Sequence, residues 1–347
     1  MNLGPTDPRH RRRLGLWLTL WAVMVLLTVV IGGVTRLTES GLSITEWNPV
    51  SGVLPPLTEA QWRTAFENYQ QIPEYQQINS GMSLAAFKRI FLVEYTHRLW
   101  ARLVGVAFAI PLFVFLLRGG LGRRLIRRLI VLLVMMGLQG GMGWYMVQSG
   151  LTERTDVSQY RLAAHLMLAL IIFAVTVWTA ADLLGQDLSG KKPSPREQPG
   201  RAAFTLLVLS TALAGAFVAG LDAGKAYNTF PLMGGRVFPA GYFQLTPWYR
   251  NIFEHVPAVQ FNHRLLGITV VVTSLIVWWA SRRKTPGTLE RRVAGWIGVA
   301  GTAQAGLGIA TLLLVVPISL AALHQAGAVI LLGLALLWWH ASADAMA

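Results

Sequence analysis

The chain has 347 residues, 54% hydrophobic and 13% charged, and its mean hydropathy of +0.48 is far too apolar for a soluble globular protein. Its formal net charge is +14, from 30 Lys and Arg against 16 Asp and Glu. The absence of cysteine excludes disulfides, thiolate metal sites, iron–sulfur clusters and cysteine nucleophiles, and leaves seven histidines as the main candidate ligands for a heavy metal.

Eight apolar runs are long enough to cross a membrane as helices, so the sequence predicts an all-α integral membrane protein. In chain order they are 14–34, 99–117, 125–147, 163–183, 202–219, 265–280, 293–315 and 318–339. The first run is too long for the apolar region of a signal peptide and lacks a small-residue cleavage site, so we expect it to be retained.

The basic residues gather on one side of these spans. More than half of the 30 lie in the amino-terminal arm and in the loops after the second, fourth and sixth spans. Cytoplasmic loops carry this excess, so both termini are predicted to be cytoplasmic. Topology signals and lipid headgroup contacts account for the clusters, and we assign them no nucleic-acid role. The short basic amino terminus, without a transit peptide, favours a bacterial inner membrane.

An internal repeat relates the two halves of the chain. The matching segments are EYTHRLWARLVG (94–105) with VQFNHRLLG (259–267), GLQGGMG (137–143) with TAQAGLG (302–308), and RLAAHLMLAL (161–170) with LAALHQAGAV (320–329). Each half has four spans, so both share one orientation, and we expect two tandem, pseudo-twofold-related four-helix bundles. The predicted division is 1–185, a polar, Pro-rich cytoplasmic linker at 186–200, and 201–347.

Four histidines occupy repeat-related positions near the outward, periplasmic ends of the spans. His97 and His263 are expected to begin the second and sixth helices, with His165 and His324 one or two turns into the fourth and eighth. A lone His in an apolar helix is most often a hydrogen-bonded core residue. Four at equal depth favour one axial pair per bundle, as in b-type haem sites. Copper or zinc is the competing interpretation, but neither half offers a third nearby ligand, and glycines in the third and seventh spans leave room for a flat macrocycle.

Charged residues beside two of these histidines differ between the halves. Arg98 and Arg264 lie where a haem propionate would emerge, although anchoring at the membrane interface explains them nearly as well. Glu94 precedes His97 by one helical turn, whereas Gln260 holds the matching place in the second half. A carboxylate at the membrane edge is costly unless it is used or paired. The first half is therefore interpreted as reactive and the second as a fixed cofactor site, with a plain Glu94–Arg98 ion pair as the alternative.

Several long motifs resemble the haem A synthase family, in its proteobacterial and mitochondrial branch. Besides the helices of His165 and His324 they are GGVTRLTESGLSITEWNPVSGVLPPL (32–57), EYTHRLWARLVG (94–105), AGLDAGKAYNTFPLM (219–233) and FNHRLLG (261–267). The resemblance covers nearly the whole chain apart from the amino-terminal arm and the linker. Some members carry a cysteine pair in the first outward loop, and this chain has none.

The resemblance implies an oxidoreductase of haem A biosynthesis and cytochrome oxidase assembly, which converts the C8 methyl group of haem O to a formyl group. It implies that His263 and His324 bind the iron of a permanent haem b. It also implies that His97 and His165 bind the iron of the substrate haem, with Glu94 as the essential acid beside them. Delivery of haem O by haem O synthase is a hypothesis, and homo-oligomer formation is left open.

Two other classes of protein compete with this interpretation. A dihaem b-type membrane electron-transfer protein would need the same ligands without a reactive glutamate. A transporter with parallel repeats would need acidic or polar residues near the middle of the membrane, and beyond the histidines and the paired glutamines the sequence offers none.

Overall fold

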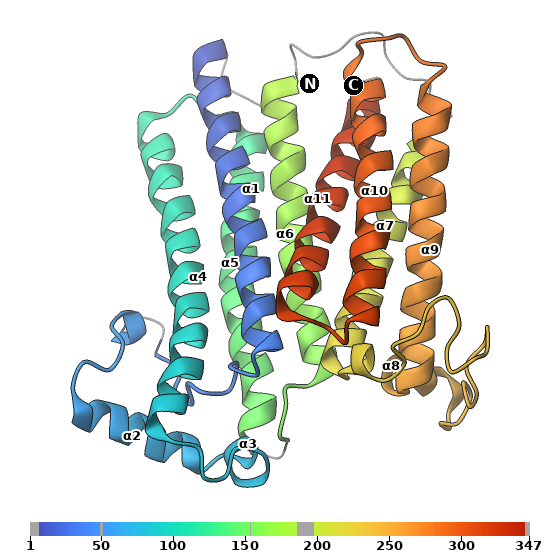
Figure 1. Ribbon diagram of the computed structural model, residues 1–347. Coiled ribbons are helices and arrows are strands. Elements are labelled where there is room, and N and C mark those ends of the chain that lie inside the picture. Colours follow the sequence, from blue (N-terminus) through green and yellow to red (C-terminus); the bar gives the residue numbers. More distant parts are fainter. Residues whose placement is uncertain (1–6, 49–50, 153, 186–197, 344–347) are drawn as a thin grey trace.

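The computed structural model describes residues 7–48, 51–152, 154–185 and 198–343, and this part of the chain is helical (Figure 1). Within it, eight helices are long and apolar enough to cross a membrane, which confirms the predicted all-α membrane protein. They are α1 (Pro8–Leu37), α4 (Leu84–Arg118), α5 (Arg123–Thr152), α6 (Gln159–Leu184), α7 (Gln198–Gly220), α9 (Val256–Ser281), α10 (Leu289–Leu313) and α11 (Ile318–Ala343). The helices α2 (Glu59–Gln70), α3 (Pro73–Gln77) and α8 (Asn251–Glu254) and three 3-10 turns, at Ser51–Val53, Ala223–Lys225 and Trp248–Arg250, lie between them.

The predicted spans coincide with these helices, with two corrections. Because α4 begins at Leu84 and α9 at Val256, His97 and His263 lie inside helices and not at their first residues. Polar and amphipathic turns precede the apolar runs, and Ser83 caps α4 by accepting a hydrogen bond from the Ala86 N–H at 3.2 Å. The seventh span ends at Leu313, before the predicted end at residue 315, because the backbone there turns to positive φ. Of the predicted linker, residues 186–197 lie outside the described part.

The helices of each half pack in a ring. In the first half α1 and α5 each contact α4 and α6, and in the second half α7 and α10 each contact α9 and α11. The histidine-bearing helices, α4 with α6 and α9 with α11, therefore stand at opposite corners. The halves meet through α1, α6, α7 and α11, which lie in the centre of Figure 1.

Indole side chains fasten α1 to α4. Trp17 and Trp21 donate hydrogen bonds to the Ala107 and Val104 carbonyls, at 3.1 and 3.0 Å. Pairing a buried indole N–H with a backbone carbonyl avoids the free-energy cost of an unsatisfied donor in an apolar interior. These bonds hold the helix that carries His97 against the centre of the molecule.

Glycines let α9 and α10 approach closely. A Cβ atom added to Gly301 would lie 2.4 Å from the Ser274 Oγ, and one added to Gly298 would lie 2.8 Å from the Trp278 Cβ. Small residues permit such backbone contact between membrane helices. In the first half α4 and α5 make little contact, and α5 has the smallest buried share of the eight spans. The two halves therefore differ at this helix pair, because α9 and α10 pack closely and α4 and α5 do not.

Replacing Gly301 by alanine should lower the thermal unfolding temperature in detergent, because overpacking at a close contact costs about 1–3 kcal/mol. Gly306→Ala is the matched control, since a Cβ added there meets no heavy atom within 4 Å. Alanine also favours a helix over glycine, so the control should be neutral or slightly stabilised. Equal unfolding temperatures for the two variants would contradict this account of the α9–α10 contact.

The first long outward segment contains two helices that the sequence analysis treated only as loop. α2 begins with a capping box in which Thr58 and Gln61 each bond the other's backbone N–H. Behind it, Tyr69, Phe87 and Phe91 belong to a separate apolar cluster under the outward surface. This cluster covers the outward end of α4, where Phe91 lies one helical turn before Glu94.

Glu74 on α3 is buried in this outward cluster, with its carboxylate accepting a hydrogen bond from the Tyr69 hydroxyl at 3.3 Å. Burial raises the pKa of Glu74 from 4.5 to about 8. The folded protein therefore holds this proton more tightly than the unfolded chain. The stabilisation is present at acidic pH and is lost as the pH rises from about 4.5 through about 8.

The unfolding temperature should accordingly fall between pH 6 and pH 9, and Glu74→Gln should make that fall smaller because glutamine mimics the protonated acid. Thermal unfolding of the detergent-solubilised chain across this pH range measures the effect. Glu67→Gln, at an exposed position of α2, is the control and should follow the wild type. A Glu74→Gln profile as steep as that of the wild type would contradict the assignment.

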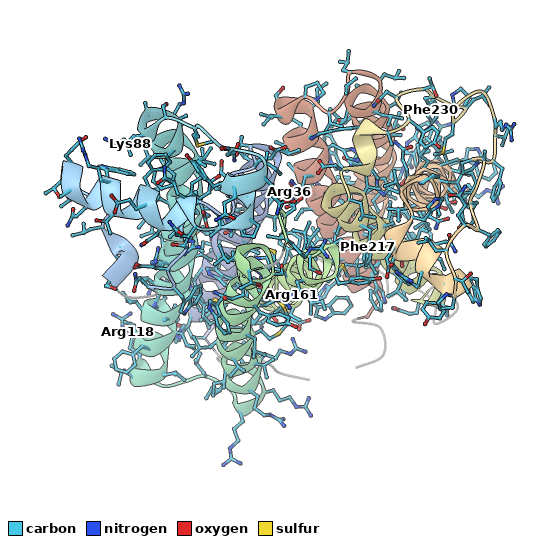
Figure 2. All side chains as sticks on the ribbon, turned by 90° about the horizontal axis from the view of Figure 1, so that it is seen from below. Arg36, Lys88, Arg118, Arg161, Phe217 and Phe230 are labelled. Carbon is cyan, nitrogen blue, oxygen red and sulfur yellow. The ribbon has the colours of Figure 1, made fainter. Side chains whose placement is uncertain are left out.

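Arg36 joins the two halves at their outward ends. Its guanidinium lies 2.7 Å from the Asp156 carboxylate in the α5–α6 loop and 3.0 Å from the Asp222 carboxylate that follows α7. It also donates to the Ala219 carbonyl at 3.1 Å. In the view from below, Arg36 lies between the two groups of helices (Figure 2).

Candidate functional site

Each of the four predicted histidines faces a glycine on a neighbouring helix. Cβ atoms added to these glycines would lie 2.8–3.1 Å from the histidine Cε1 atoms, closer than ordinary van der Waals contact. The pairs are Gly32 (α1) with His97 (α4), Gly143 (α5) with His165 (α6), Gly215 (α7) with His263 (α9), and Gly308 (α10) with His324 (α11). The same arrangement recurs at corresponding helices of both halves, so each imidazole has a cradle that any larger residue would fill.

His263 and His324 approach each other across the second half. Their ring centres are 6.3 Å apart and their planes stand at 87°. An imidazole nitrogen binds a transition metal at about 2 Å and its ring centre lies about 1 Å further back, so two axial imidazoles have ring centres about 6 Å apart. The observed separation fits one metal held between the two rings. Both side chains are half-buried, as expected if one edge of each ring faces the space between the helices where the metal would lie.

Backbone and amide groups orient these rings. The Thr211 carbonyl lies 3.2 Å from the His263 Nδ1, a contact that leaves the Nε2 of that ring free for a ligand. Gln304 donates to the His324 carbonyl at 2.7 Å, and Gln139, its repeat partner, donates to the His165 carbonyl at 3.1 Å. Gln139 also lies 3.2 Å from the His165 Nδ1. The paired glutamines noted in the sequence thus support the histidines of α6 and α11.

Two of the fully buried ring nitrogens in these pairs have no hydrogen-bond partner among the described residues, namely Nδ1 of His97 and Nδ1 of His324. Buried polar groups normally find a partner or mark a site that binds something else. Within the same part of the chain, no three His, Asp or Glu side chains gather as a metal site. The donor set is thus two imidazoles, which suits axial ligation of a planar metal complex better than a tetrahedral zinc site.

Glu94 lies one turn from His97 and is only 3% exposed. Its Oε2 accepts hydrogen bonds from the Ser43 hydroxyl at 2.7 Å and from the Ile44 N–H at 2.8 Å. Its Oε1 accepts two from the Arg98 guanidinium, at 3.0 and 2.7 Å. Both the ion pair and a loop contact are therefore formed, and the carboxylate is held in one orientation beside the His97 helix turn.

The guanidinium groups of Arg98 and Arg264 donate hydrogen bonds to backbone carbonyls of the outward loops. Arg98 donates to the Ile44 and Glu46 carbonyls at 2.9 and 3.1 Å, and Arg264 donates to the Tyr227 and Thr229 carbonyls at 2.6 and 2.7 Å. The repeat thus places an arginine clamp under the long outward loop of each half. Propionate binding by these arginines stays a prediction, and the Nε of Arg264 has no partner among the described residues.

The sequence predicted the histidines, the glutamines and the glutamate of the site, but it did not reveal two of the four glycines that face the histidines. Gly32 and Gly215 face His97 and His263 from α1 and α7, which carry none of the four site histidines. The signal available was small residues near the outward ends of the first spans of both halves. The Ser43 and Ile44 contacts to Glu94 could not be read from the sequence, because they join residues about 50 positions apart.

Fold and site together define a class of multi-pass helical membrane proteins with a histidine pair between opposite helices. Comparison with known proteins gives the particular family. The model of the cytochrome oxidase assembly protein family matches residues 15–336. The haem A synthase of Parvibaculum lavamentivorans is 49% identical over 335 residues, covering 96% of this chain and 95% of the relative. That of Rhodospirillum centenum is 50% identical over 327 residues, covering 94% and 87%.

A third relative, the haem A synthase of Rhizobium meliloti, is 46% identical over 338 residues, covering 97% of this chain and 92% of the relative. The chain belongs to the haem A synthase family of cytochrome oxidase assembly proteins. This confirms the resemblance read from the motifs. The dihaem electron-transfer alternative receives no support from these relatives.

Proposed function

We propose that this chain makes haem A, by oxidising the C8 methyl group of haem O to a formyl group. The observation that carries the proposal is the 6.3 Å approach of His263 and His324, which fits an iron porphyrin, in a chain about half identical to haem A synthases over nearly its full length. The methyl group passes through the alcohol to the hydrated aldehyde, which then loses water. Each of these two oxidations removes two electrons from the substrate and adds one oxygen atom, supplied either by dioxygen or by water together with a separate electron acceptor.

The two halves take different roles in this proposal, as tandem four-helix units related by a pseudo-twofold axis. The ring packing of the helices and the four matching histidine–glycine contacts support the repeat. The tight α9–α10 contact supports a permanent haem b in the second unit, at 201–347. The sparse contact between α4 and α5 supports exchange of substrate and product in the first unit, at 1–185.

The residues of the first unit position and activate the substrate. His97 and His165 bind the haem O iron, and Glu94 accepts a proton released from the methyl carbon attached to C8. Arg98 holds one oxygen of the Glu94 carboxylate, and Ser43 holds the other. In the second unit His263 and His324 hold haem b, which when bound supplies one-electron transfer.

We further propose a bacterial inner membrane location with both termini in the cytoplasm. The basic residues at the end of the molecule where α1 begins and α11 ends support this orientation (Figure 1). It places the four histidines near the periplasmic side. Haem O synthase is the proposed donor of haem O, because direct transfer avoids releasing an apolar haem into water.

Haem extraction tests the activity. The chain is expressed in a host that makes haem O and has no haem A synthase, and extracted haems are identified by mass. We expect haem A, together with protohaem in the purified protein. Unchanged haem O in cells whose purified protein carries two protohaems would instead assign the chain to electron transfer.

A further inference from the structure

A basic hollow lies far from the histidines, between the end of α9 and the start of α10. It has a volume of about 320 Å³ and is lined by Trp278, Ser281, Arg282, Arg291 and Arg292 with two glycines. We call it the α9–α10 basic pocket. Three of its lining residues are arginines and none is acidic. Figure 1 shows these two helices side by side, joined at the end of the molecule where α1 begins.

The positive charge of this pocket is not neutralised by the nearest acid. Glu290 is engaged away from it, by Arg201 at 2.5 Å and Lys284 at 3.3 Å. α10 begins at Leu289, so Arg291 and Arg292 stand in its first turn. The helix dipole is positive there, and Glu290, the acid of this first turn, is already paired with Arg201 and Lys284. Charge and dipole therefore both favour an anionic ligand.

The walls of the pocket suit a ligand with an apolar part. The Arg282 guanidinium stacks on the Trp278 ring, 4.2 Å from its centre, an arrangement that leaves in-plane N–H groups able to donate to an oxyanion. Trp278 is 38% exposed near the end of α9, a helix that crosses the membrane. A tryptophan at such a position lies at the level of the lipid headgroups.

We propose that the α9–α10 basic pocket binds the phosphate headgroup of an anionic phospholipid, with the arginines on the phosphate and Trp278 against the start of the acyl chains. The proposal is independent of the haem chemistry, because it uses no residue of the histidine sites. A free anion such as inorganic phosphate shares the charge chemistry and lacks the apolar part. The choice between the two sources of phosphate is therefore open to experiment.

Native mass spectrometry of the purified full chain tests the site, with phosphatidylglycerol, phosphatidylcholine of the same acyl chains, and inorganic phosphate as probes. The test variant combines Arg291→Gln with Arg292→Gln. The control combines Arg123→Gln with Arg127→Gln, at the start of α5, the repeat partner of α10. We expect the wild type and the control to retain phosphatidylglycerol over phosphatidylcholine, and the test variant to lose at least about tenfold in affinity.

Three results would overturn the proposal: equal phosphatidylglycerol binding by wild type and test variant, an equal loss in the control, or displacement of the lipid by millimolar phosphate. The last would assign the pocket to a free anion. Arg282→Gln is a second variant in case the double substitution does not fold, and it should weaken lipid binding in the same direction. Thermal unfolding with and without phosphatidylglycerol gives an independent readout, since a ligand of the folded state raises the unfolding temperature.

Discussion

Replacing His324 by alanine should empty the second unit of haem b. Loss of an axial ligand should lower bound haem by more than about tenfold, since even changes outside the ligand shell cost 10- to 100-fold in affinity. The measurement is the visible spectrum and extracted haem of the purified protein. His255→Ala is the control, because His255 contacts Gln244 in the outward segment and has no repeat partner. Full haem b content in His324→Ala would remove this residue from the site.

A substitution that leaves the ligand itself intact tests the same geometry. Gly308→Leu places a side chain where an added Cβ already lies 2.8 Å from the His324 Cε1, so it should displace the ring and also deplete haem b. Gly306→Leu, two residues earlier and at an exposed position of α10, adds the same volume where nothing lies within 4 Å. Haem loss in Gly308→Leu but not in Gly306→Leu would show that the glycine cradle holds the imidazole in place.

Replacing Glu94 by glutamine should abolish most haem A formation and let haem O or its alcohol accumulate. Loss of a general base typically costs about 10²- to 10⁴-fold in rate. The assay is mass analysis of haems extracted from cells, alongside the haem b spectrum and unfolding temperature of the purified variant. These two readouts are needed because Glu94→Gln also breaks a buried ion pair with Arg98.

Ser43→Ala is the matched control for Glu94. It removes one hydrogen bond to the carboxylate and keeps both its charge and the Arg98 pair. We expect it to retain most haem A formation. Wild-type haem A output from Glu94→Gln would exclude this carboxylate from the reaction and leave it the role of anchoring the 43–46 loop.

The sequence was most informative about site residues that are three or four positions apart on one helix. Glu94 lies one turn before His97 and Arg98, and Gln260 lies one turn before His263 and Arg264, so Glu94 and Gln260 each share a helix face with these neighbours, as expected. Helix type and number follow from runs of apolar residues, which is why all eight spans are confirmed. The predicted starts of α4 and α9 are too late, because an apolar run shows which residues lie in the membrane, whereas these helices begin in polar residues before it.

Contacts across helices and loops could not be predicted in the same way. The amphipathic α2 and its capping box lie in a segment too polar to register as a span. The roles of Gly301 and Gly32 depend on which helix faces which, and a single sequence does not contain that information. The same holds for the contacts of Arg98 and Arg264 with the loops. Their acceptors are backbone carbonyls, which every residue has, so the sequence does not show which residues they bind.

Arg36 has a consequence for how the two units work together. One guanidinium holds a carboxylate from each half, and it does so at the depth of the outward helix ends, next to the histidines. Separating the halves there would break the pair between Arg36 and Asp222, and Asp222 would keep only Lys225, at 3.1 Å. If each half holds a haem, as proposed, this clamp would help keep the distance between the two porphyrins constant, and with it the rate of electron transfer between them.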